Sequence, residues 1–173
     1  MDEKPTFTIK WILPEDQWEE VRARTIENAP GSSYDRNQLG RYHLLDGDVD
    51  FEFAGLPFYG RSPGRGPVNL SLFDLGIALA DAYLKHRFDP DAEATFNQLD
   101  DDRHIYFRGD DAFIKISAND QPLELHVPRE AFQRGVISFL CGLAGEIRRR
   151  VEILMQWESM APLREVVARF CID

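Results

Sequence analysis

The stretch from Val68 to Arg87 constrains the fold most, because it predicts a helix that is apolar around most of its circumference. Ser71 precedes Asp74 by three residues, a spacing in which the serine can accept a hydrogen bond from a free N–H group at a helix start. Apolar side chains then recur at spacings of three, four and seven residues, and only a thin polar stripe interrupts them, formed by Asp74, Asp81 and Lys85. A helix of this kind is buried on most sides, so the sequence predicts a central helix with a single core around it.

Alternating apolar and polar residues predict strands on both sides of this helix. The first strand is expected at Thr6–Leu13, and Asp46-Gly47, a dipeptide typical of tight turns, predicts a hairpin between Arg41–Leu45 and Asp48–Ala54. After the helix, turn-prone clusters separate four short segments, and such short connections favour antiparallel pairing. These segments are Ala94–Leu99, His104–Arg108, Ala112–Ser117 and Leu123–Val127.

Helical spacing returns at the end of the chain. Apolar residues from Phe132 to Leu154 predict a long helix over Pro128–Gln156, and Pro162 separates it from a short closing helix. The expected fold is therefore a single α+β domain over residues 1–173, with a mostly antiparallel sheet packed against the central buried helix and the long C-terminal helix.

The composition limits the classes of partner and the cellular location that can be expected. The chain has 173 residues and a net charge of −10, which disfavours nucleic acid and anionic membrane as partners. No run of 18 apolar residues and no secretion signal stands in the sequence, so the expected location is the cytoplasm, without membrane association. Cys141 and Cys171 do not suggest a disulfide framework, and Cys141, within an apolar helical run, is expected to be a buried and inert thiol.

Catalytic and cofactor signatures are absent from the sequence. It contains no nucleophile elbow, phosphate-binding loop, dinucleotide fingerprint or Cys-x-x-Cys pair. We therefore expect that the protein is not an enzyme and that it binds no cofactor and no metal. The histidines lack the spacing of a metal site. His104 and His126 could still lie on neighbouring strands, and a small-ligand pocket beside them and the Gly60–Pro67 loop is a less favoured alternative.

The segment from Asp46 to Glu52 is the most visible polar feature. It fails as a calcium loop, because Phe51 and Pro57 stand where an EF-hand needs Gly and Glu. Carboxylates two residues apart on a strand are spaced by about 6.8 Å and could receive a basic partner, whereas the simpler interpretation is a solvated strand face. Aspartates in two later turns could extend such a surface, although Asp is common in turns for local reasons. The predicted partner-binding residues are Asp46, Asp48, Asp50, Glu52, Asp100, Asp101, Asp102, Asp110 and Asp111.

The layout of the chain resembles that of a known class of proteins. An aromatic-rich first strand (Phe7–Trp11), a Phe-x-Phe strand (Phe51, Phe53) and a Leu-Ser-Leu-Phe-Asp-Leu helix start (Leu70–Leu75) precede a sheet and a long helix. In this the chain is similar to small immunity proteins that neutralise bacterial polymorphic or contact-dependent toxins. The resemblance implies a one-to-one complex with a toxin domain, and it carries over no functional residue.

The sequence is therefore compatible with two functions from different classes. The first is an acidic, cytoplasmic protein-binding module of bacterial origin that neutralises a basic toxin. The alternative is a structural or regulatory subunit that assembles through the long helix over Pro128–Gln156.

Overall fold

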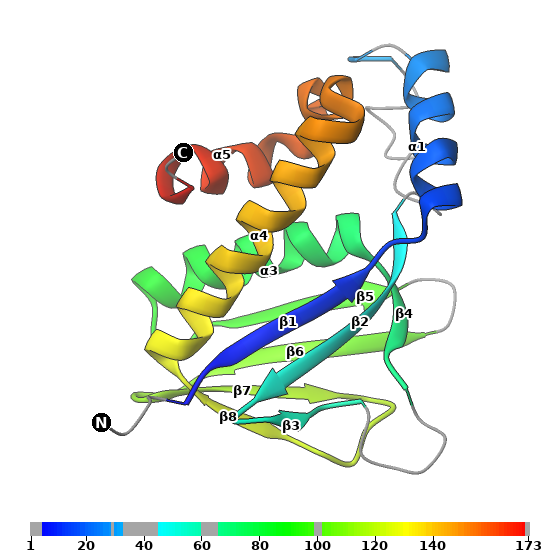
Figure 1. The fold of residues 1–173 in the computed structure, drawn as a ribbon. Coiled ribbons are helices and arrows are strands. Elements are labelled where there is room, and N and C mark those ends of the chain that lie inside the picture. Colours follow the sequence, from blue (N-terminus) through cyan, green and yellow to red (C-terminus); the bar gives the residue numbers. More distant parts are fainter. Residues whose placement is uncertain (1–4, 29, 33–44, 60–65, 99–101, 172–173) are drawn as a thin grey trace.

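The strands form two antiparallel sheets, and α3 to α5 gather along one side of them (Figure 1). The computed structural model describes residues 5–28, 30–32, 45–59, 66–98 and 102–171. The first sheet, called sheet A, contains β1 (Phe7–Ile12), β2 (Asp46–Phe53), β3 (Leu56–Pro57) and β4 (Val68–Ser71). The second, sheet B, has the order β5-β6-β7-β8, formed by Glu93–Gln98, Arg103–Gly109, Phe113–Ala118 and Leu125–Pro128.

The helices connect and cover these sheets. They are α1 (Glu15–Glu27), α3 (Leu72–Phe88), α4 (Arg129–Val151) and α5 (Ala161–Phe170). Two short 3₁₀ helices, Glu152–Gln156 and Glu158–Met160, lie between α4 and α5, so the predicted long helix ends at Val151. The α+β class with a long C-terminal helix is confirmed, and the strands divide between two sheets.

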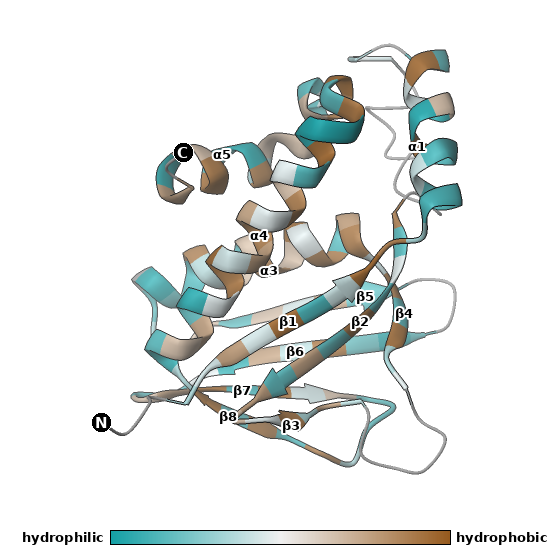
Figure 2. Cartoon of the chain, in the orientation of Figure 1, coloured by the Kyte–Doolittle hydropathy of each residue, from teal (hydrophilic) through white to brown (hydrophobic). Residues whose placement is uncertain are grey.

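Aromatic side chains from both sheets meet in the core. The Phe51 ring of β2 lies 6.3 Å from that of Phe107 on β6, measured between centroids. Phe132 of α4 lies 6.0 Å from Phe107 and 5.7 Å from Phe7 of β1. Figure 2 shows the apolar residues along the strands and helices, whereas α1 is largely hydrophilic. The core is thus enclosed by sheet A, sheet B and the helices on their side.

The central helix has the properties that the sequence predicts. The Ser71 hydroxyl oxygen accepts a hydrogen bond from the Asp74 N–H at 3.3 Å and caps α3. Leu72, Leu75 and Leu79 are fully buried. On the polar stripe, Asp81 and Lys85 form an ion pair of 2.7 Å.

The predicted hairpin at Asp46-Gly47 is wrong. Both residues lie inside β2, and Gly47 is needed for close packing, because a Cβ there would lie 2.7 Å from the Ile12 carbonyl oxygen. The tight turn occurs instead after β2, at Ala54 and Gly55, which have φ angles of 51° and 76°. The other predicted strand falls, up to residue 44, outside the described residues.

The expectation of free thiols is also wrong. Cys141 of α4 and Cys171, which follows α5, form a disulfide with Cα atoms 5.6 Å apart. Leu163, Val166 and Val167 of α5 are buried, so the helix already packs on the core where the disulfide attaches it. The sequence shows the two cysteines 30 residues apart but not the docking of α5 that brings them together.

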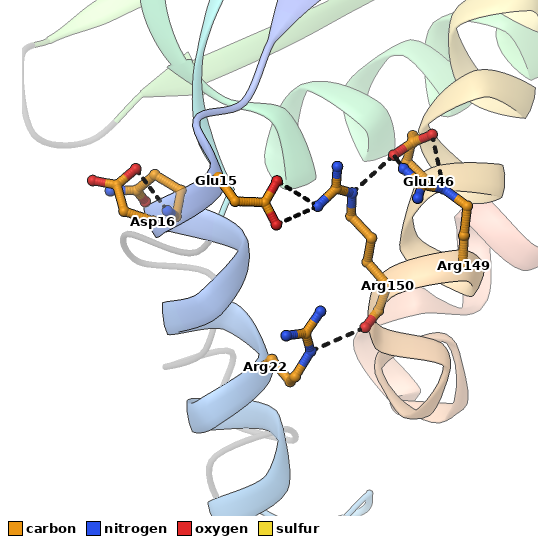
Figure 3. Close-up of polar contacts among 7 residues, drawn as sticks. Glu15, Asp16, Arg22, Glu146, Arg149 and Arg150 are labelled. Carbon is orange, nitrogen blue, oxygen red and sulfur yellow. Dashed lines mark hydrogen bonds and ion pairs between the residues drawn. The ribbon is translucent and has the colours of Figure 1, made fainter.

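Helix α1 is attached to the rest of the molecule through Arg150, in the last turn of α4 (Figure 3). The guanidinium group donates hydrogen bonds of 2.7 Å to both carboxylate oxygens of Glu15 and one of 3.0 Å to Glu146. It also lies over the Trp18 ring, 5.2 Å from its centroid. Bonds from Arg149 and Arg150 hold the pKa of Glu146 below its usual range. These arginines therefore serve the fold, together with the buried side chains of Trp18, Val21 and Thr25 on α1.

Candidate protein-binding surface

The outward side chains of β1, β2 and β4 form the outer face of sheet A. Opposite the core-facing residues, this face carries Thr8, Lys10, Ile12, Asp48, Asp50, Glu52 and Asn69. Lys10 pairs with Glu52 across the strands, which neutralises both charges locally. Asp48 is exposed and lies between Ile12 on one side and Asn69 on the other.

Ile12 is the residue on this face that sequence reasoning missed. Its side chain is 68% exposed, although it belongs to a regular strand. An exposed apolar side chain contributes favourable free energy when a partner covers it and removes it from water. The signal was available, because Ile12 follows Thr8 and Lys10 at the strand period of two.

Asp50 was predicted to belong to the acidic row but is buried. It is 9% exposed, and its carboxylate accepts a hydrogen bond of 3.0 Å from the Tyr59 N–H. Burial raises its pKa above the ordinary value, although the backbone hydrogen bonds from Tyr59 and Phe58 oppose this effect. The segment after β3 covers the carboxylate, so Asp50 cannot contact a partner. Asp46 is half-buried at the start of β2.

The described acidic turns of sheet B lie apart from each other, and the one at Asp102 borders sheet A, because the adjacent Arg103 donates a hydrogen bond of 3.4 Å to the carbonyl oxygen of Asn69. Asp100 and Asp101 lie outside the described residues. Asp102 precedes β6 and Asp110 follows it, so the turns lie at opposite ends of one strand, about 20 Å apart. Asp102 and Asp110 therefore do not form one acidic patch.

Local hydrogen bonds explain two of these aspartates. The Asp110 carboxylate accepts hydrogen bonds from the N–H groups of Ala112 and Phe113, at 3.1 and 2.9 Å, and these bonds lower its pKa. The Asp102 carboxylate lies 2.9 Å from Nε2 of His104, while Asp111 is exposed. Asp110 therefore shapes the β6–β7 turn, as the simpler interpretation of the turn aspartates expects.

The alternative pocket near the histidines is not assembled in the described residues. Strand β7 separates β6, which carries His104, from β8, which carries His126. His104 contacts Asn97 and Asp102, whereas His126 contacts Glu124. Residues 60–65 of the loop lie outside the described part of the chain. Within that part, no group of three or more His, Cys, Asp or Glu side chains is placed to hold a metal ion.

Comparisons with known proteins give no guide to this surface. No protein-family model, curated protein or solved structure matches the chain. Among the helices in the described ranges, none is long and apolar enough to cross a membrane.

Proposed function

We propose that the protein is a protein-binding module that neutralises a cognate bacterial toxin, and that it does so through the outer face of sheet A. The net charge of −10 favours a basic partner and would accelerate its association. The sequence layout that resembles immunity proteins supports the same function.

The observation that carries the proposal is the pairing of Ile12 with Asp48. An exposed isoleucine supplies apolar area, and the carboxylate beside it selects a basic neighbour on the partner. Asp48 forms no ion pair in the described part of the chain, so its charge is available. Of the acidic residues of β2 that were predicted to bind a partner, Asp48 is therefore the one that we propose to contact it, together with the adjacent Ile12.

The test uses the full chain as bait in an extract of its native host. We expect capture of a basic protein that is toxic when expressed alone and harmless when expressed with this chain. An acidic partner, or a partner without toxicity, would contradict the proposal.

Variants then locate the interface. Ile12→Ala and Asp48→Lys should each weaken binding of the captured partner by about tenfold or more, and Asp48→Lys should also reduce the salt dependence. Asp111→Lys, an exposed acidic position on sheet B, is the matched control and should change affinity little. Equal losses from Asp48→Lys and Asp111→Lys would remove the outer face of sheet A from the mechanism.

The cytoplasmic location stays a prediction, and the disulfide bears on it. Disulfides persist in oxidising compartments and are rare in the cytosol. Cells lysed in the presence of a thiol-reactive polymer would report the state of the pair, because only free thiols gain mass. A protein that gains mass would agree with a reducing compartment such as the cytoplasm. A protein that gains no mass would place both the protein and its binding of the toxin outside the cytoplasm.

A further inference from the structure

A cleft of about 310 Å³ lies on the seam between β1 and α4. Its β1 side is formed by the strand from Thr6 to Trp11, and its α4 side by residues spaced three and four apart on one helical face. These helix residues are Ala131, Arg134, Gly135, Ser138 and Phe139. Pockets of this size hold small ligands or short peptide segments.

The floor of the cleft is the unpaired edge of β1 at Ile9. In an antiparallel pair, every second residue turns its backbone groups away from the neighbouring strand. Phe51, opposite Ile9, uses its carbonyl oxygen on the far side of β2, where it accepts a 2.7 Å hydrogen bond from the Phe58 N–H. Three residues before Ile9, the Thr6 carbonyl oxygen accepts a 3.1 Å bond from the Ala54 N–H, so Thr6 and, at the strand period of two, Thr8 turn their backbone groups toward β2. The N–H and C=O groups of Ile9 therefore point toward the cleft, and no described residue bonds to them.

The wall of the cleft supplies a cation. The Arg134 side chain is 57% exposed, and the carboxylate of Glu130, with which it pairs, lies at 3.7 Å, beyond hydrogen-bond distance. An exposed pair of this kind contributes little, so the guanidinium group is available to a ligand. The exposed Ser138 hydroxyl lies one helical turn further along the same wall.

Close contacts on both sides of Ile9 limit what can enter. Gly135 approaches Phe7 so closely that a Cβ would lie 2.5 Å from the Phe7 carbonyl oxygen. On the other side, the rings of Trp11 and Phe139 meet edge to face, with centroids 6.4 Å apart. A continuous strand cannot run along this edge, whereas a chain end can enter at Ile9.

We propose that the cleft binds the free C-terminus of an extended peptide segment. The backbone of the peptide pairs with the N–H and C=O of Ile9, and its terminal carboxylate binds Arg134 and Ser138. The site does not depend on the toxin proposal, since Ile12 and Asp48 take no part and the ligand is anionic.

The experiment follows backbone amide shifts of the full chain by ¹⁵N–¹H spectroscopy. The probe is a mixture of acetylated tetrapeptides, randomised at each position, with a free C-terminal carboxylate. The same mixture with amidated C-termini and acetate ion alone are compared at equal concentration. We expect saturating shifts at the Ile9 and Ser138 amides with the first mixture at low millimolar concentration, about tenfold weaker binding for the amidated mixture, and no saturation with acetate.

Variants test the geometry. Arg134→Gln should weaken binding about tenfold, and Ser138→Trp should fill the cleft and abolish binding. Arg148→Gln, at an exposed position of the same helix outside the cleft, should leave binding unchanged. Absence of shifts at Ile9 and Ser138, equal binding of the amidated mixture, or equal binding of acetate would each overturn the proposal.

Discussion

Asp50 differs from its neighbours on β2 because Tyr59 covers it and donates a backbone hydrogen bond to it. Removing the acceptor with Asp50→Ala leaves that buried N–H without a partner, and we expect a loss of about 1–3 kcal/mol in the free energy of unfolding. Asp50→Asn keeps an acceptor oxygen and removes a buried charge, so it should be neutral or stabilising at pH 7. Urea unfolding measures both variants.

The pH dependence at Asp50 has a defined sign. The pKa of Asp50 is raised in the folded state, so the unfolded chain binds fewer protons. Ionisation therefore opposes folding as the pH rises from the ordinary pKa of 3.8 through the folded-state pKa. The advantage of Asp50→Asn should therefore vanish on acidification below about pH 3.8. Asp48→Ala, on the exposed neighbour, is the control and should change stability by less than about 0.5 kcal/mol. A larger loss for Asp50→Asn than for Asp50→Ala would contradict this account.

His86 is the second residue whose ionisation is coupled to folding. It is 2% exposed, Nε2 donates a 3.2 Å hydrogen bond to the Phe107 carbonyl oxygen, and Nδ1 has no partner among the described residues. Burial lowers its pKa from 6.5, against the bond to Phe107, and the nearby Arg129 acts in the same direction as burial. The folded protein thus holds the imidazole neutral.

Stability from the neutral His86 is fully present above pH 6.5 and is lost as the pH falls below it, because the unfolded chain then binds the extra proton. We expect the free energy of unfolding to fall between about pH 7 and pH 5. His86→Gln, which can still donate to Phe107, should have a flatter profile over the same range. Parallel profiles for the two proteins would show that His86 does not titrate in this range.

At the scale of elements, α4 contains glycines with opposite roles. Gly142 and Gly145 are exposed in the helix interior, and a Cβ at either would meet no atom within 4 Å. Alanine there should raise the free energy of unfolding by about 0.5–1 kcal/mol per site, because it restricts the unfolded chain. Gly135→Ala should instead destabilise by about 1–3 kcal/mol, since its Cβ would overlap Phe7. Chemical denaturation of the three variants checks this, and a stabilising Gly135→Ala would show that α4 can move away from β1.

Light scattering addresses the alternative of assembly through α4. If the protein assembles through this helix, it should have the molecular mass of an oligomer at micromolar concentration. A monomeric mass would count against this alternative.

Elements were predictable where the signal is local. The period of two in β1 and the near-continuous apolar surface of α3 are properties of consecutive residues, and both elements form as expected. The prediction of a turn at Asp46-Gly47 failed because it used only the local turn preference of this dipeptide. The need for glycine at position 47 comes instead from close packing against the carbonyl oxygen of Ile12, which is distant in the sequence. Asp50 failed for a related reason, since the segment at Tyr59 folds back over it. The cleft at Ile9 needs the position of α4, which no spacing in the sequence gives.

At the scale of the whole molecule, the Cys141–Cys171 disulfide connects the last helix to the middle of α4. Closing a loop of 30 residues in the unfolded chain corresponds to about 3.5 kcal/mol of stabilisation if the effect is entropic. Reduction should therefore lower the free energy of unfolding by about 3 kcal/mol. The protein should stay folded, because α5 also buries Leu163, Val166 and Val167.

The matched control is the Cys141→Ala/Cys171→Ala double variant, which should resemble the reduced protein and be insensitive to reductant. Amide hydrogen exchange should be faster in α5 after reduction, since this helix then depends on its own packing alone. Identical denaturation midpoints with and without reductant would mean that the disulfide does not constrain the unfolded chain. Loss of all structure on reduction would mean that the packing of α5 requires the disulfide. The apolar contacts of α5 would then contribute less to the free energy of unfolding than their buried area indicates.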